Sequence, residues 1–183
     1  PYYLLTGGHL SNYIAVFLFY SGFLLAVFAL LWEIVKKWFP KTPFFIYLMI
    51  SVLTVCAGNY LFVIARPDLY DTPIMAANMF TAAGFWLWIR GKYTLSAGKR
   101  KICYILGSLS MALVAGCRPQ MLLFSFLAIP LFWEEVIEKR ELFGKKNLWD
   151  TFCLCIPYAF VAAGIMYYNA ARFGSPVDFG AAY

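Results

Sequence analysis

The sequence has little charge and almost no histidine, and these shortages exclude several classes of protein. Charged residues make up 13% of the 183 residues, whereas about a quarter of the residues in a soluble domain are charged. The single His9 cannot form a metal cluster by itself. The five cysteines lack the paired spacing of a zinc site and of a secreted disulfide framework. The residues therefore indicate no metal site. The identity of any cofactor stays open, and a divalent metal is one option.

Hydrophobic residues are in large excess instead, at 63% of the chain, and the mean hydropathy is +0.72. This composition is typical of an integral membrane protein. We predict an all-α fold, a polytopic transmembrane helical bundle with about six spans, in which residues 1–183 form part of one transmembrane domain. Because the sequence begins at Pro1 without a Met, it reads as an internal fragment of a longer chain. The predicted spans cover residues 12–32, 44–65, 73–89, 102–117, 119–133 and 148–171.

Two of these apolar segments, 102–117 and 119–133, are joined only by Arg118. At about 1.5 Å per residue each is roughly 22 to 24 Å long, which is short of the ~30 Å hydrocarbon core. They form either a short hairpin around Arg118 or one helix kinked at Pro119. We favour the hairpin because it keeps the basic loops on one side of the membrane.

Basic residues are distributed unevenly between the two sets of loops. One set holds Lys36, Lys37, Lys41, Arg90, Lys92, Lys99, Arg100, Lys101, Lys139, Arg140, Lys145 and Lys146, and the other holds only Arg66, Arg118 and Arg172. The positive-inside rule places the first set in the cytoplasm. Both ends of the chain are then expected to face outward, in a multi-pass protein of the bacterial cytoplasmic (inner) membrane. We expect the lipid bilayer as a partner and no nucleic acid.

The three outward residues are all arginine, the side chain whose planar fork grips phosphate through two hydrogen bonds. Each lies where a span meets an outer loop. Further polar residues fall in the outer loops or the outer halves of spans, namely Asn59, Asp68, Asp71, Asn78, Gln120, Asn169 and Asp178. Ionisable groups near membrane depth tend to face a cavity or to pair with one another. The alternative is local: Arg66 pairs with Asp68 or Asp71, and Arg118 extends to the interface. For the three arginines taken together, we predict a shared polar cavity that faces outward.

Two further patterns concern the ends of helices. Thr72 and Pro73 have the residue types of a helix N-cap and of the first helical position, so Asp71 has either a local capping role or a role toward substrate. Glu135 stands four residues before Lys139, in the order that favours an ion pair on one helix.

Three stretches carry a resemblance to a known family. They are residues 1–10 (PYYLLTGGHL), residues 106–119, which begin Leu106-Gly107 and end Cys117-Arg118-Pro119, and above all residues 168–180 (YNAARFGSPVDFG). The chain resembles bacterial multispanning proteins of the GT-C glycosyltransferase class, kin of polyprenyl- and dolichyl-phosphate-dependent sugar transferases. The resemblance covers most of the chain and is strongest in the last stretch.

The resemblance implies transfer of a sugar from a polyprenyl-phosphate donor to an extracytoplasmic acceptor. The general base would be an acidic residue in a first outer loop upstream of Pro1, so the full-length protein is expected to be the enzyme and this fragment alone to be inactive. The expected substrate-binding residues are Arg66, Asp71, Arg118, Arg172 and Asp178. Arg172 would reach the phosphate, Asp178 would hold Arg172, and Gly174 and Gly180 would let the backbone turn closely.

Two other functions remain open from the sequence. The first is a transporter or flippase for a lipid-linked or anionic solute, which would need polar groups through the whole depth of the membrane. The second is a non-catalytic membrane scaffold, favoured if the full-length protein lacks an acidic residue in its first outer loop. The remaining helices and extracytoplasmic part of the same polypeptide are expected as partners of this chain. The residues do not identify the sugar or the acceptor.

Overall fold

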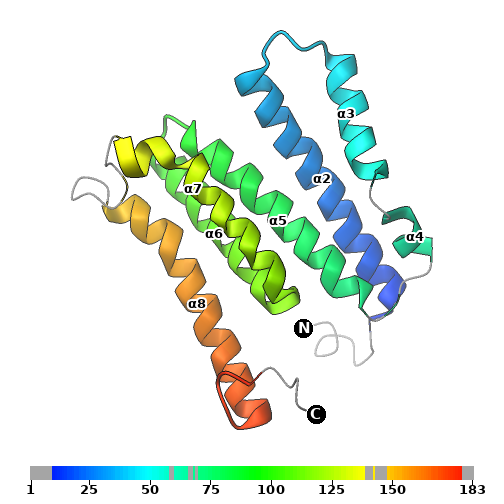
Figure 1. Ribbon diagram of the computed structural model, residues 1–183, viewed down its shortest axis with the longest axis vertical. Helices are drawn as coiled ribbons and strands as arrows, with labels where there is room; N and C mark the ends of the chain where they lie inside the picture. Colours follow the sequence, from blue (N-terminus) through cyan, green and yellow to red (C-terminus); the bar gives the residue numbers. More distant parts are fainter. Residues whose placement is uncertain are drawn as a thin grey trace.

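Every regular element that the computed structural model describes is helical, which confirms the all-α prediction (Figure 1). The structure describes residues 10–57, 60–65, 68, 70–138, 142 and 148–178, and no strand occurs among them. The elements are α2 (Asn12–Trp38), α3 (Phe44–Cys56), α4 (Tyr60–Ala65), α5 (Asp71–Lys92), α6 (Ala97–Cys117), the 3-10 helix η1 (Pro119–Leu127), α7 (Ala128–Leu131), a π-helical turn η2 (Glu134–Glu138) and α8 (Leu148–Phe173).

Three of these helices, α2, α6 and α8, are long and apolar enough to cross a membrane. The longest, α2, has 27 residues and so extends about 40 Å. Large apolar side chains on its surface are exposed, among them Phe17, Leu18 and Leu25. These features agree with the predicted membrane protein.

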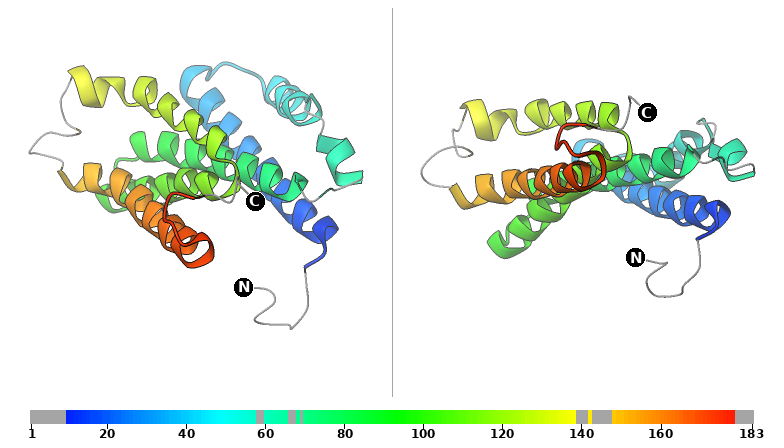
Figure 2. Two further views of the ribbon diagram at one scale, coloured as in Figure 1. Left: turned by 60° about the horizontal axis from the view of Figure 1, so that its bottom comes forward. Right: turned by 90° about the horizontal axis from the view of Figure 1, so that it is seen from below.

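Helix α5 occupies the middle of the bundle, with α2 on one side and α6 on the other (Figure 1). Helix α8 packs on the far side of α6, and η1 with α7 forms a second layer (Figure 2). Helices α6 and α8 run in the same direction, because Arg100 pairs with Asp150 near their beginnings and Gly116 approaches Ile165 near their other ends. Helix α5 runs opposite to α6.

Small residues bring α5 and α6 together. A Cβ atom at Gly107 would lie 2.7 Å from Cδ1 of Trp88 and 3.2 Å from the carbonyl oxygen of Gly84. Close approach at small residues is a common way to pack membrane helices. The indole of Trp88 is buried at this crossing, where its Nε1 donates a hydrogen bond to Oγ of Ser108 at 3.1 Å.

The predicted second span, residues 44–65, is wrong as a single helix. Helix α3 ends at Cys56 and α4 begins at Tyr60. The sequence between them contains Gly58 and Asn59, which are both poor helix formers. The run is apolar and long enough to span a membrane, but it forms two helices instead of one.

The segment from residue 102 to 133 folds as the predicted hairpin. Helix α6 ends at Cys117, Arg118 has an extended backbone (φ −146°, ψ 95°), and η1 returns along α6. The rings of Tyr104 and Phe132, on opposite arms, have centroids 5.6 Å apart. A 3-10 helix rises about 2.0 Å per residue, so η1 and α7 together extend roughly 24 Å, still short of the ~30 Å hydrocarbon core.

The start of α5 differs from the prediction of a Thr72 cap. The helix begins at Asp71, with Tyr70 in the N-cap position and no side-chain capping bond. Oδ2 of Asp71 accepts a hydrogen bond from the backbone N–H of Asp68 at 2.7 Å, which ties the preceding loop to the helix. Pro73 is then the third helical residue, where a backbone N–H has no intrahelical partner to lose. The helix is also longer than the predicted span and continues to Lys92.

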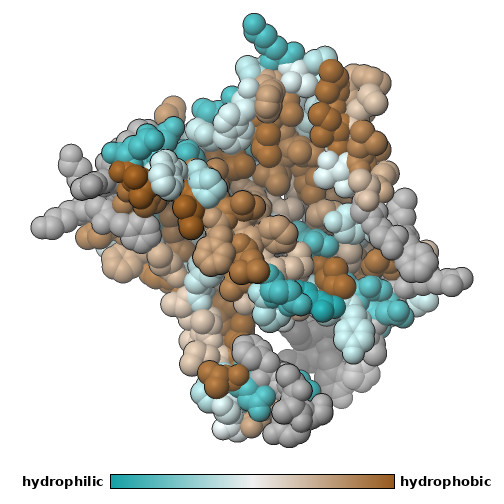
Figure 3. All heavy atoms as spheres, in the orientation of Figure 1, coloured by the Kyte–Doolittle hydropathy of each residue, from teal (hydrophilic) through white to brown (hydrophobic). Residues whose placement is uncertain are grey.

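The bundle has two chemically different ends. The described Lys and Arg residues at the ends of α2 and α5 and at the start of α6 lie together at the top of Figure 1, and we call this the basic end. The opposite end carries the Arg118 turn, the start of α5 and the end of α8, and we call it the Arg118 end. Figure 3 shows apolar surface over α2 and α3 between hydrophilic regions above and below.

Candidate functional site

Arg118 is fixed at the turn of the hairpin by its own backbone. Its N–H donates to the carbonyl of Val114 at 2.8 Å, and its carbonyl accepts a hydrogen bond from the N–H of Met121 at 2.9 Å. Its side chain is half-buried and donates from Nη2 to the carbonyl oxygen of Tyr70 at 3.4 Å. The guanidinium therefore lies against Tyr70, just before the beginning of α5.

Two buried polar atoms at this place have no hydrogen-bond partner within the described part of the chain. They are Nε of Arg118 and Oγ1 of Thr72. A buried donor left without a partner costs about 1–3 kcal/mol. A ligand oxygen that accepted from Nε would remove this cost, and an anionic oxygen would do so best because the guanidinium is always charged.

Two other predicted substrate-binding residues, Asp71 and Arg66, come from the chain just before or at the start of α5. Arg118 bonds to Tyr70, the residue before Asp71, and the Asp71 carboxylate accepts the hydrogen bond from the Asp68 backbone, in agreement with the local alternative. Arg66 lies outside the described residues. The pairing of Arg66 with Asp68 or Asp71 stays a prediction.

An apolar cavity of about 350 Å³ opens beside the Arg118 turn. It lies between α6, η1 and α8 and is lined by Ala112, Ala115, Pro119, Leu122, Tyr158, Val161, Ala162, Ile165 and Met166. Pro119, which directly follows Arg118, lines this cavity, whereas the Arg118 side chain bonds to the Tyr70 carbonyl before α5. The turn of the hairpin is thus next in sequence to an apolar cavity.

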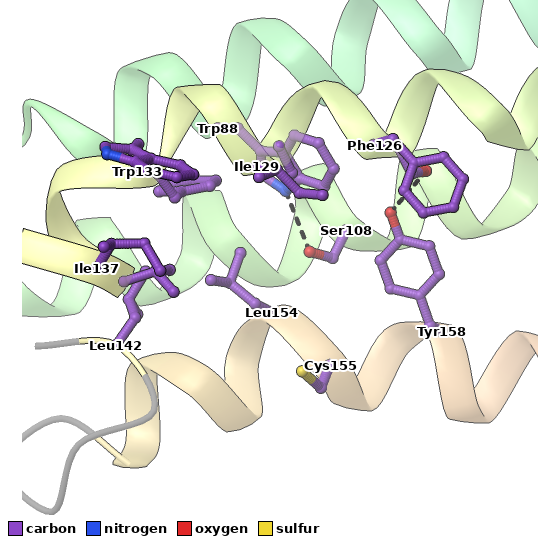
Figure 4. Close-up of a pocket in the computed structure, with 14 residues that line it drawn as sticks. Trp88, Ser108, Phe126, Ile129, Trp133, Ile137, Leu142, Leu154, Cys155 and Tyr158 are labelled. Carbon is purple, nitrogen blue, oxygen red and sulfur yellow. Dashed lines mark hydrogen bonds between the residues drawn. The ribbon is translucent and has the colours of Figure 1, made fainter. Parts of the chain in front are cut away.

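A second apolar cavity, of about 380 Å³, continues toward the basic end and shares Tyr158 as a lining residue (Figure 4). It is lined by Trp88, Ser108, Ser125, Phe126, Ala128, Ile129, Phe132, Trp133, Val136, Ile137, Leu142, Leu154, Cys155 and Tyr158. The hydroxyl of Tyr158 donates to Oγ of Ser125 at 3.0 Å. This bond joins α8 to η1 where the two cavities adjoin, and together they form what we call the hairpin groove.

Arg172 belongs to the same end of the bundle but to a different surface. It lies in the last turn of α8, is exposed, and donates from Nη1 to the hydroxyl of Tyr168 at 2.6 Å. Its guanidinium carbon lies 5.1 Å from the ring centroid of Phe173. Seven residues separate Arg172 from Ile165, so it stands roughly 10 Å beyond the cavity along the helix axis. Arg118 and Arg172 are not brought into one cluster.

The loop after α8 folds back on the helix. Gly174 has a φ of +76° and donates its N–H to the carbonyl of Ala170 at 3.0 Å, so the backbone turns closely at this glycine, as predicted, where the helix ends. The buried Asn169 donates from Nδ2 to the carbonyl of Pro176 at 3.4 Å. The half-buried Asp178 follows, its N–H donating to the carbonyl of Ser175 at 3.4 Å. Gly180 lies outside the described residues, and the role of Asp178 toward Arg172 stays a prediction.

The sequence did not reveal several polar contacts between elements. Lys92 pairs with Glu135 at 3.2 Å, and Nε of Arg100 with Asp150 at 2.8 Å. Glu135 therefore contacts α5, whereas its predicted partner Lys139 lies outside the described residues. Ser125 and Tyr158 were recognisable only as polar side chains within apolar runs, which at membrane depth indicate a partner or a cavity.

Metal binding has no support in the part of the chain that the structure describes, where no group of three or more His, Cys, Asp or Glu side chains converges. Comparison of the chain with known proteins finds no matching family model, no matching curated protein and no matching solved structure.

Proposed function

We propose that this chain forms the donor-lipid site of a membrane glycosyltransferase that takes a sugar from a polyprenyl-phosphate carrier. The carrier has an anionic head and a long apolar tail. Arg118 would bind the phosphate and favour its departure as a leaving group. The hairpin groove would hold the first part of the tail.

One observation carries the proposal, namely that the half-buried Arg118 directly precedes, at the hairpin turn, a residue that lines an apolar groove. The buried Nε of Arg118 has no described partner, and the residue after it lines the groove. The two cavities of the groove have volumes within or near the range of small-molecule sites, and they follow the membrane-crossing helices α6 and α8. A ligand that is charged at one end and apolar along its length fits this arrangement.

The site requires the Arg118 end to face the outside of the cell. The excess of Lys and Arg at the basic end supports this orientation through the positive-inside rule. With about six crossings of the bacterial cytoplasmic membrane, the sugar would be transferred to an extracytoplasmic acceptor. The general base would be the acidic residue of a first outer loop that the family resemblance implies.

The proposal is tested in the full-length protein with a sugar-transfer assay from polyprenyl-phosphate donors. Arg118→Ala is expected to abolish most transfer, because phosphate binding and leaving-group stabilisation are lost together. Arg172→Ala, on a separate surface, is expected to have a smaller effect. Lys99→Ala, at the basic end, is the matched control and should retain wild-type transfer.

Full activity in both arginine variants would exclude the site assignment. A different outcome would favour a flippase: movement of the lipid carrier across vesicle membranes that depends on Arg118, without any sugar transfer. Carrier binding without either activity would favour a scaffold.

A further inference from the structure

Two helix ends converge at the basic end around one aromatic side chain, Tyr93. Nζ of Lys37, in the last turn of α2, lies 3.9 Å from the centroid of the Tyr93 ring. The ring of Trp38 meets Tyr93 edge-on, with centroids 5.7 Å apart. Nζ of Lys92 lies 5.8 Å from the same ring. Cations and aromatic rings from α2 and α5 thus share one surface.

Much of this surface is exposed and apolar as well as basic. Phe39 is 60% exposed and Leu95, in the loop between α5 and α6, is fully exposed. Arg90 is also exposed and lies over the ring of Trp86, at 5.5 Å. Exposed aromatic and aliphatic residues beside cations are typical of the boundary between the hydrocarbon core and the headgroups.

The loop after α2 adds a hollow to this surface. An open concavity of about 430 Å³ is lined by Trp38, Phe39, Pro40, Lys41 and Thr42. Two ring side chains form its walls and Lys41 supplies a charge. Its size and chemistry suit a phosphate headgroup with the upper part of its acyl chains.

Most cations of this surface form no ion pair with another described residue. The ion pairs at this end join Lys92 to Glu135 and Arg100 to Asp150. Lys37, Lys41 and Arg90 take part in none of them. Cations in the last turns of α2 and α5 also complement the helix dipoles, but that effect does not require both helices to converge on Tyr93.

We propose that this surface, formed by Lys37, Trp38, Lys41, Arg90 and Tyr93, binds anionic phospholipid headgroups of the leaflet that it contacts. The aromatic rings fix the depth of the surface at the interface, and the cations select negatively charged headgroups. Each Lys or Arg near an anionic lipid surface strengthens binding by an amount that corresponds to about fivefold in affinity. The site is at the opposite end from Arg118 and does not depend on the glycosyltransferase proposal.

The test is native mass spectrometry of the full chain purified in detergent and titrated with phosphatidylglycerol or with phosphatidylcholine. We expect retention of phosphatidylglycerol over phosphatidylcholine. The double variant Lys37→Gln/Arg90→Gln should lower the affinity for phosphatidylglycerol roughly 25-fold. The matched control Lys99→Gln/Lys101→Gln removes the same amount of charge from α6. It should change the affinity for phosphatidylglycerol by less than about fivefold.

Three results would overturn the proposal. The first is equal loss in the two double variants, which would indicate a diffuse charge effect without a built site. The second is equal retention of the two lipids. The third is that a soluble polyglutamate peptide binds as tightly as phosphatidylglycerol, which would indicate an acidic protein partner. Far-ultraviolet circular dichroism of each variant checks that its helices are intact.

Discussion

At the scale of single residues, position decides what each polar side chain does. Arg118 and Arg172 are the same residue type at the same end of the bundle. Arg118 is half-buried at a tight turn beside an apolar groove, whereas Arg172 is exposed and held by Tyr168 on its own helix. A sequence shows that both are arginines next to spans, and only the folded chain separates their surroundings.

The first prediction concerns the shape of the Arg118 side chain. Arg118→Lys keeps the positive charge but loses the planar fork and the buried Nε. We expect the affinity for polyprenyl phosphate to fall about 10-fold or more, the equivalent of one charge-assisted hydrogen bond. Isothermal titration with detergent-solubilised protein measures this. Wild-type affinity in Arg118→Lys would show that only the charge matters.

The buried bond between Trp88 and Ser108 gives a second prediction. Ser108→Ala leaves the indole N–H without an acceptor at the most closely packed crossing, so we expect the unfolding free energy to fall by about 1–3 kcal/mol. Ser110→Ala is the control, because Oγ of Ser110 donates to the Leu106 carbonyl at an exposed position of the same helix. Thermal denaturation in detergent compares the two. Equal stability of the two variants would contradict the importance of the buried bond.

At the scale of elements, close packing at small residues holds α5 against α6, and the ion pairs Lys92–Glu135 and Arg100–Asp150 connect elements at the basic end. Nζ of Lys92 also donates to the carbonyl of Leu131 at 2.5 Å, which ties the end of α5 to the second arm of the hairpin. The walls of the hairpin groove are therefore fixed to the central helix. A rigid groove of this kind binds a flexible tail with less loss of protein entropy.

A substitution at the helix crossing tests this packing. A Cβ atom at Gly107 would overlap the Trp88 ring, so Gly107→Ala should lower the unfolding free energy by about 1–3 kcal/mol. Gly164→Ala is the matched control on α8, since nothing lies within 4 Å of its Cβ position. The control should be neutral or slightly stabilising, because alanine favours a helix over glycine. Equal thermal stability in the two variants would contradict the close crossing.

Some of the elements could be predicted from the sequence and others could not. Apolar length predicted the long helices, and the requirement that the basic loops lie on one side of the membrane correctly predicted the hairpin over one helix kinked at Pro119. The break between α3 and α4 was missed because hydropathy averages over the intervening Gly and Asn. The ion pairs were missed because their partners are distant in the sequence. Of the candidate site, the sequence indicated Arg118 and Asp71 individually, whereas the groove depends on how three elements pack.

At the scale of the whole molecule, the two ends differ in chemistry, and the positive-inside rule predicts an orientation from this difference. The basic end carries most of the described cations, and the Arg118 end carries the hairpin turn, whose Pro119 lines the groove, and the loop after α8. A donor lipid would enter at one end while headgroups of the other leaflet hold the opposite end. The two proposed sites thus use the two faces of one membrane.

The orientation is testable with single cysteines in a cysteine-free background. Lys41→Cys and Ser96→Cys should react with a membrane-impermeant maleimide only after the cytoplasmic face is opened. Ser175→Cys should react in intact spheroplasts. Labelling of all three positions from one side would contradict the alternation of the loops.

The central claim is that a polyprenyl phosphate occupies the hairpin groove with its phosphate at Arg118, and photo-crosslinking tests it most directly. A polyprenyl phosphate with a photoreactive group near its head would be irradiated with the full-length protein and the adducts mapped by mass spectrometry. We predict adducts on groove residues of α8 and η1, between Tyr158 and Met166 and around Leu122, that are competed by unlabelled polyprenyl phosphate and not by polyprenol. Adducts spread over the exposed faces of α2 and α3, with no competition, would contradict the claim.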